Sequence, residues 1–216
     1  MIAKNMIAIP LETKTTQMIG TTTKTLSRAE TIYPISQSEA NTKSSGLVLP
    51  LSVVSYDNLN ASPSTEVKYD KYDEKGNILQ YTIKEGIPVA IVWGYNQTQP
   101  IAKIEGITYA ELLAGNLITT IVSKSNDDAA DPTKEGLLLN ALNDFRKQSA
   151  FVGKQVSTFT YDPLIGVTSI TPPSGIREVY VYDTANRLKE VKVREKDAAG
   201  NFVFKKVKEY NYNYKQ

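Results

Sequence analysis

Five aspartates recur at similar places in short polar segments, and their type and spacing could in principle support chemistry. Paired carboxylates act as general acids and bases or bind metal ions. Each of these aspartates, however, precedes a glycine or asparagine by three or four residues. An aspartate at the start of a turn accepts hydrogen bonds from following backbone amides, and Gly or Asn then tolerates the left-handed conformation that closes a hairpin. We therefore predict structural turn residues and no catalytic residue at Asp57, Asp73, Gly76, Asp162, Gly166, Asp183, Asn186, Asp197 and Gly200.

The chain contains neither histidine nor cysteine. Ser-His-Asp and Cys-His catalysis, disulfides, thiolate zinc sites and the usual histidine metal sites are therefore excluded. An enzyme could still use a carboxylate pair or a lysine. We expect a protein that is not an enzyme and that carries no cofactor and no metal.

A second cluster of oxygen ligands lies at Asn126-Asp127-Asp128 and Asp131. Calcium needs about 6–8 oxygen ligands, and this spacing matches no EF-hand loop. The alternative is a solvated loop over residues 123–130, followed by a helix with Asp131 as its N-cap and Pro132 at its first position. We favour the loop and cap.

Two groups of aromatic residues are candidate binding residues: Trp93 with Tyr95, and Tyr210 with Tyr212 and Tyr214. The second group alternates with asparagine, which places its rings on one face of a strand. Either group could form a platform for a glycan or a peptide. The alternative is cross-strand packing, which is the commoner use of large aromatic side chains in sheets.

The net charge is +2 and 22% of the residues are charged. The lysines beside the C-terminal tyrosines suggest a nucleic-acid surface only weakly, because Glu209 and the low net charge oppose it. No apolar run approaches the ~18 residues of a membrane helix. Residues 1–10 lack the features of a signal peptide and predict an ordinary strand. We therefore expect no nucleic acid and no membrane span.

The elements that position these residues are mostly strands separated by turns. Residues 11–46 are rich in threonine and serine and predict one or two polar strands, then a loop near 41–46. An apolar strand is predicted over 47–55, with Pro50 marking an edge or bulge. Further strands are predicted at 65–72, 78–84, 88–95, 101–105, 156–161, 167–171, 176–182, 188–195 and 202–214.

Residues 107–149 interrupt the strand pattern. Thr108 and Glu111 fit a capping box, after which Leu112 to Ile121 follow helical spacing. A second helix is predicted from Asp131 to Gln148. The predicted segments are polar N-terminal strands and loop (1–46), a first repeat block (47–106), a helical hairpin insertion (107–150) and a second repeat block (151–216).

The segment Tyr182-Asp183-Thr-Ala-Asn186-Arg187-Leu188 resembles the tyrosine-aspartate (YD) repeat of RHS proteins, Tyr-Asp-x-x-Gly-Arg-Leu. The segment Tyr72-Asp73-Glu-Lys-Gly76-Asn77-Ile-Leu79 is similar, with Asn in place of Arg. Residues 160–191 and 91–104 resemble, more narrowly, YD-repeat proteins of Bacteroidota such as Flavobacterium and Chryseobacterium. The resemblance suggests a C-terminal fragment or a short relative.

This resemblance implies a mainly β fold: antiparallel YD-repeat hairpins in a curved sheet or a partial RHS-like shell, with the helical hairpin inserted. It implies a secreted or cell-surface protein whose export signal is not present in this chain. The expected function is a non-enzymatic scaffold or shell wall that binds a protein partner or the rest of a longer RHS chain. The alternatives are an adhesin-like module for a glycan or protein, and a toxin-associated RHS component.

Overall fold

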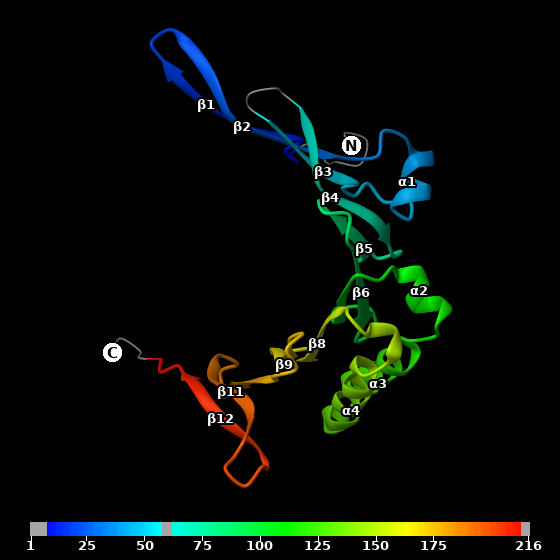
Figure 1. Cartoon of the computed structure of the whole chain (residues 1–216), viewed down its shortest axis with the longest axis vertical. Coiled ribbons are helices and arrows are strands. Elements are labelled where there is room, and N and C mark those ends of the chain that lie inside the picture. The colour runs from blue at the N-terminus through cyan, green and yellow to red at the C-terminus, as the bar shows by residue number, and fades with distance from the viewer. Residues whose placement is uncertain (1–7, 58–61, 213–216) are drawn as a thin grey trace. The chain divides into compact units, whose positions relative to one another are not determined.

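A computed structural model describes residues 8–57 and 62–212. The described residues form twelve antiparallel strands that pair in the order in which they occur along the chain, with the helices gathered in two places (Figure 1). The mainly β, antiparallel fold that the sequence predicts is therefore confirmed. The strands are β1 (Glu12–Ile19), β2 (Thr22–Ile32), β3 (Ser52–Tyr56), β4 (Pro63–Tyr72), β5 (Ile78–Ile83), β6 (Pro88–Gly94), β7 (Gln99–Glu105), β8 (Gln155–Asp162), β9 (Gly166–Thr171), β10 (Glu178–Tyr182), β11 (Leu188–Lys196) and β12 (Phe202–Glu209).

The helices are α1 (Gln37–Lys43), α2 (Tyr109–Ala114), α3 (Thr119–Ala130) and α4 (Glu135–Arg146), with short 3-10 turns η2 (Pro132–Lys134) and η3 (Ser149–Phe151). The chain divides into two compact units. The first contains the described residues up to Ala90 together with Ile107–Tyr109, and the second contains Ile91–Gly106 and the described residues from Ala110 onward. Each unit is described by itself below.

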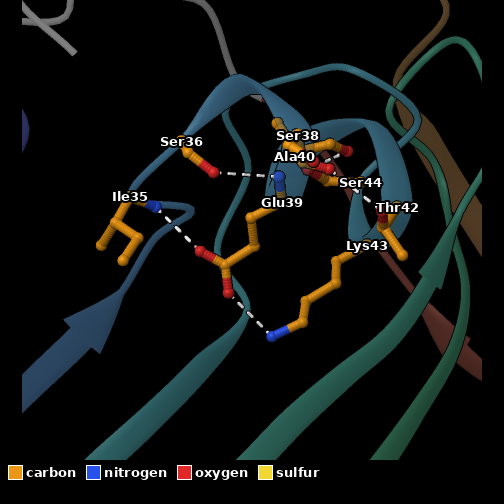
Figure 2. Close-up of polar contacts among 8 residues, drawn as sticks. All are labelled: Ile35, Ser36, Ser38, Glu39, Ala40, Thr42, Lys43 and Ser44. Atoms are coloured by element: carbon orange, nitrogen blue, oxygen red, sulfur yellow. Dashed lines mark hydrogen bonds and ion pairs between the residues drawn. The ribbon is translucent and has the colours of Figure 1, made fainter.

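In the first unit, helix α1 lies where the sequence predicts only strand and loop. Figure 2 shows why it forms: the hydroxyl of Ser36 accepts a hydrogen bond from Glu39 N, and the Glu39 carboxylate accepts one from Ile35 N. The same carboxylate pairs with Lys43 one turn later. Serine followed three residues later by glutamate is a capping-box signature. The prediction of strand and loop is therefore wrong for residues 37–43, where this capping signature begins a helix in a Ser- and Thr-rich segment, whereas residues 44–46 are not helical.

The predicted strand over 47–55 is also wrong in its first half, since β3 begins at Ser52. Leu47 and Leu49 instead lie against the turn at Gly76, where an added Cβ would sit 3.5 Å from each leucine. The hydroxyl of Tyr72 donates a 2.6 Å hydrogen bond to the carbonyl of Pro50. Residues 47, 49 and 50 are therefore held by side-chain contacts, whereas the backbone of Leu51 bonds to Ile32 O and Tyr69 N on the two flanking strands.

In the second unit, helices α3 and α4 pack together, α3 against β7 and α4 against β8. Their buried side chains, with those of the adjacent strands, form the apolar core of this unit: Val92, Ile101, Ile104, Leu112, Ile121, Leu138, Leu142, Phe145 and Val156. Most of the apolar burial that stabilises this unit thus comes from helices covering strands.

The inserted helices differ from the prediction in their boundaries. Residues 123–130 are the second half of α3 and not a polar loop. The inward face of α3 carries Ser125 and Asp128, both buried, so its sequence lacks the apolar stripe that predicts a helix. The preceding helix is only the short α2, which ends at Gly115-Asn116, where Asn116 has a φ of 47°.

The last strand ends earlier than predicted. β12 stops at Glu209, and the described residues 210–212 are not in a strand. Within the described residues, no helix combines the length and apolar character needed to cross a membrane.

Candidate functional site

The turns at Asp73, Asp183 and Asp197 share one hydrogen-bond pattern. In each, the carboxylate accepts bonds from the backbone amides two and four residues later, at 2.8–3.0 Å. The amide of the third residue donates to the aspartate carbonyl. That third residue, Gly76, Asn186 or Gly200, has a positive φ of 87°, 59° or 83°. All three carboxylates are thus engaged by turn amides.

A further participant in each turn is the residue after the glycine or asparagine. The side chain of Asn77 donates to Asp73, and that of Arg187 pairs with Asp183 at 2.7 Å. Asn201 makes the weaker equivalent contact with Asp197, at 3.5 Å. Sequence reasoning missed these residues, although aligning the three turns would have shown a hydrogen-bond donor at this position each time.

The longer turn at Asp162 follows a different plan. Asp162 accepts a bond from Leu164 N, and Gly166 has a φ of 146°. A Cβ at Gly166 would lie 3.1 Å from the hydroxyl of Tyr182, which donates to the carbonyl of Val167. Gly166 therefore leaves the room that Tyr182 needs to reach the backbone.

Tyr95, a candidate binding residue, is buried, with an exposure of 2%. Its hydroxyl donates to Asp128 at 2.7 Å and accepts a bond from Tyr161 N at 2.9 Å. The hydroxyl of Ser125 accepts a bond from Tyr95 N. An open aromatic platform that includes Tyr95 is therefore wrong, because this side chain links α3 to β8 inside the second unit.

Burial, the hydrogen bond to Asp128 and nearby carboxylates raise the pKa of the Tyr95 hydroxyl, so it stays protonated and donates. Burial also raises the pKa of Asp128, helped by Glu135, Asp162 and Asp131, whereas the Tyr95 hydrogen bond lowers it. A raised carboxyl pKa in a cleft is a common sign of catalysis. Here both groups are enclosed and satisfied, which identifies the network as structural.

The backbone around Tyr95 is unusual. Tyr95, Asn96 and Gln97 have consecutive positive φ values of 49°, 58° and 65°. Non-glycine residues adopt this conformation only where the surroundings impose it. Asn126 accepts a bond from Asn96 N at 2.8 Å, and a Cβ at Gly94 would clash with Ser125 at 2.1 Å. Close packing of α3 therefore imposes this turn.

Trp93 is half-buried on the face of β6 opposite to the buried Val92 and Gly94. The predicted turn at Asp57 runs into residues 58–61; these residues and Tyr214 lie outside the described part of the chain. Asp57 itself donates its backbone amide to Ser62 O.

Helix α3 and its C-terminal end contain the cluster considered for calcium. Asn126 and Asp128 are bonded as above, and Asp127 pairs with Lys124. Asp131 caps the 3-10 turn at Pro132 by accepting a bond from Thr133 N. In residues 8–57 and 62–212, no group of three or more acidic side chains is arranged to hold a metal ion.

Tyr210 and Tyr212 line a shallow groove of about 420 Å³ beside the Asp183 turn. The guanidinium of Arg187 lies 4.4 Å from the ring centre of Tyr212, whose hydroxyl donates to the carbonyl of Leu188. Tyr210 N donates to the carbonyl of Lys189. Tyr210 and Tyr212 remain 40% and 44% exposed, so they combine anchoring to the sheet with a surface that a partner could cover.

The two terminal strands of the described sheet, β1 and β12, are exposed at every residue. Each nevertheless carries large apolar side chains: Met18 and Ile19 on β1, and Phe202, Phe204 and Val207 on β12. An exposed apolar edge strand is a template for pairing with another strand. These edges are the strongest candidate interaction surfaces of the protein.

No protein-family model matches the chain, and no curated protein matches it. The solved structures similar to it include the TcdB2-TccC3 crystal structure without its hypervariable C-terminal region, and TcdB2-TccC3-Cdc42. The first is 10% identical with a TM-score of 0.41 and covers 84% of this chain. The second is 10% identical with a TM-score of 0.42 and covers 85%. This chain spans only 8% of the length of either chain, and we assign no family on a likeness this weak.

Proposed function

We propose that this protein is a non-enzymatic structural β module, a scaffold or wall element, that associates with further β structure through its edge strand β12. The support is the full exposure of β12 together with its apolar side chains. Exposed apolar strand edges favour strand addition by a partner. The bulge of β12 lies at Val207, so the segment from Phe202 to Lys206 keeps a regular register with β11. The partner is another protein or the remainder of a longer RHS-like chain.

The backbone of β12 supports this proposal. Arg194 on β11 donates its amide to Arg177 O, which lies on the side away from β12. Arg194 is the register partner of Phe204. Arg194 and Phe204 therefore form a non-hydrogen-bonded pair, in which both residues direct their amides and carbonyls away from each other. The amide and carbonyl of Phe204 therefore face the open edge.

The Tyr-Asp turns support the scaffold role, because their aspartates are occupied by backbone amides and leave no carboxylate pair free for catalysis. The resemblance of these turns to RHS repeats supports export of the protein to the cell surface or the medium. Association with a toxin is a more specific form of the same proposal and rests on that resemblance alone.

The proposal is tested with a photoreactive phenylalanine at position 202, in cells that produce the full chain. We expect crosslinks to a β-rich segment, and we expect them to persist in Phe204→Ala but to be lost in Phe204→Pro. The proline removes the outward amide without breaking a bond to β11. The same probe at Leu164, an exposed turn residue, is the negative control. Equal crosslinking by Phe204→Pro, or equal crosslinking at both positions, would overturn the proposal.

A further inference from the structure

A groove of about 640 Å³ in the second unit lies between α4 and strands β11 and β12. One wall is made by α4, including Leu137, Asn140 and Asn143, and the other by Arg177, Arg194 and the rings of Phe202 and Phe204. The volume falls within the ~300–1,000 Å³ typical of ligand pockets. None of the turn or binding residues predicted from the sequence contributes to it.

Arg177 is the most buried cation of this groove, with an exposure of 8%. Its Nε donates to the Thr171 hydroxyl at 3.2 Å, and one Nη donates to the Asn143 amide oxygen at 2.7 Å. Both acceptors are neutral. Within the described part of the chain, no carboxylate forms an ion pair with Arg177.

The surroundings of Arg177 add positive charge. Burial lowers its pKa, and so do the nearby charges of Arg194 and Arg146, with only Glu135 acting in the opposite direction. Arg146 bonds to carbonyl oxygens alone, those of Val156, Thr171, Pro172 and Pro173. The Glu135 carboxylate is itself occupied by the hydroxyls of Thr160 and Thr168.

Arg194 completes the cationic side of the groove. Its guanidinium lies 3.9 Å from the ring centre of Phe202, and no ion pair to a carboxylate is formed within the described residues. A guanidinium that stacks on an aromatic ring keeps its edge free to donate hydrogen bonds in the ring plane. Arg194 is thus held against an aromatic ring and is not neutralised by an ion pair within the described residues.

We propose that this groove binds a carboxylate that is flanked by apolar side chains, as in an acidic segment of a protein partner. Buried cations are normally paired, because desolvation of an unpaired charge is costly. Two guanidinium groups line this groove, and a guanidinium binds a carboxylate through charge-assisted hydrogen bonds. The exposed rings of Phe202 and Phe204 and the exposed side chain of Leu137 provide apolar contacts beside it.

Charge complementarity favours an acidic segment at the Phe202 end of this face. Lys196 lies 5.4 Å from the ring of Phe202 and adds positive charge there, whereas Lys192 and Lys206 are already paired with Glu190 and Glu209. This inference rests on the proposed function, since it identifies the chemistry of the partner that meets the second unit. It extends that function by placing the partner's carboxylate at Arg177 and Arg194.

Binding of acetyl-Phe-Glu-Phe-amide and acetyl-Phe-Gln-Phe-amide to the full chain, measured by calorimetry, tests the proposal. We expect the Glu peptide to bind about tenfold more tightly, because its contact is charge-assisted and bidentate. Arg194→Gln is expected to abolish that preference. Arg28→Gln, which changes an arginine of the first unit, is expected to preserve it. Equal affinities for the two peptides, or an unchanged preference in Arg194→Gln, would refute the site.

Two further arms separate the ligand chemistries and the folding effects. Glutarate is expected to compete with the Glu peptide at lower concentration than inorganic phosphate, and the reverse order would overturn the assignment to carboxylate. Arg177→Gln is expected to lose the Glu preference with a folded circular dichroism spectrum; a folded variant that retains it would also refute the site.

The two proposals can fail independently. If neither peptide binds while the β12 crosslinks persist, only this inference fails. If the crosslinks fail while the Glu peptide binds, the edge-strand function fails.

Discussion

The hydroxyl of Tyr95 lies 2.7 Å from the carboxylate of Asp128, and the two residues join a left-handed turn to the inward face of α3. The same hydroxyl accepts a hydrogen bond from the backbone amide of Tyr161. One buried oxygen therefore satisfies groups from two other elements, which makes it a sensitive point of the second unit.

Tyr95→Phe should lower the free energy of unfolding by about 2–4 kcal/mol, because it leaves a buried carboxyl and a buried amide without their partner. Urea denaturation followed by circular dichroism measures the change. Tyr161→Phe is the control: it keeps the ring that packs edge-on against Tyr95 at 5.6 Å and leaves both Tyr95 hydrogen bonds in place. Equal losses in the two variants would show that the hydroxyl network is not the source of the stability.

Asp128 should make stability depend on pH. Burial raises its folded-state pKa above the ordinary value of 3.8, so the folded protein binds the proton more tightly than the unfolded chain. The stability that the protonated Asp128 contributes to the folded state is therefore fully present below pH 3.8 and is lost as pH rises through the folded-state pKa. We expect wild type to lose stability relative to Asp128→Asn across this window. Other titrating groups are common to both proteins, so parallel pH profiles would contradict the prediction.

The same substitution should have opposite effects at two glycines. Gly94→Ala places a Cβ 2.1 Å from the Ser125 hydroxyl and 2.8 Å from Ile101, so α3 must move and we expect a loss of several kcal/mol. Gly136→Ala meets nothing within 4 Å in helix α4 and should stabilise by about 0.5–1 kcal/mol. Thermal unfolding of both variants checks the signs, and a neutral Gly94→Ala would show that α3 is not packed against β6.

The left-handed position in the Asp183 turn should accept glycine but not alanine. Asn186 has a φ of 59°, which costs an ordinary side chain about 1 kcal/mol. Asn186→Ala should therefore lower the urea midpoint, whereas Asn186→Gly should leave it unchanged or raise it. Indistinguishable midpoints for the two variants would mean that the turn does not require this conformation.

The strands and turns could be predicted because their signals are local. Alternating apolar residues and Asp-x-x-Gly or Asp-x-x-Asn segments place β4, β5, β10 and β11 close to their observed positions, and they place the start of β12 correctly. Helix α1 carried its own signal in Ser36 and Glu39, which were not recognised as a cap.

Other features depend on contacts that no local pattern records. Helix α3 was missed because its inward residues, Ser125 and Asp128, are polar and are satisfied by Tyr95, some thirty residues earlier. The arginine-lined groove was missed for a similar reason. Arg177 and Arg194 occur among ordinary surface charges in the sequence, and only the approach of α4 turns them into one wall of a cavity.

The tyrosine hydroxyls that reach back to earlier backbone carbonyls have an evolutionary consequence. Tyr72 donates to Pro50, Tyr182 to Val167 and Tyr212 to Leu188, over separations of 22, 15 and 24 residues. Donor and acceptor lie about one hairpin apart, so duplication of a whole hairpin copies both halves of each contact. Duplication of a single strand copies only one half. The chain is therefore expected to lengthen by whole hairpins. Duplications within its gene that arise by unequal recombination should accordingly have the length of a hairpin.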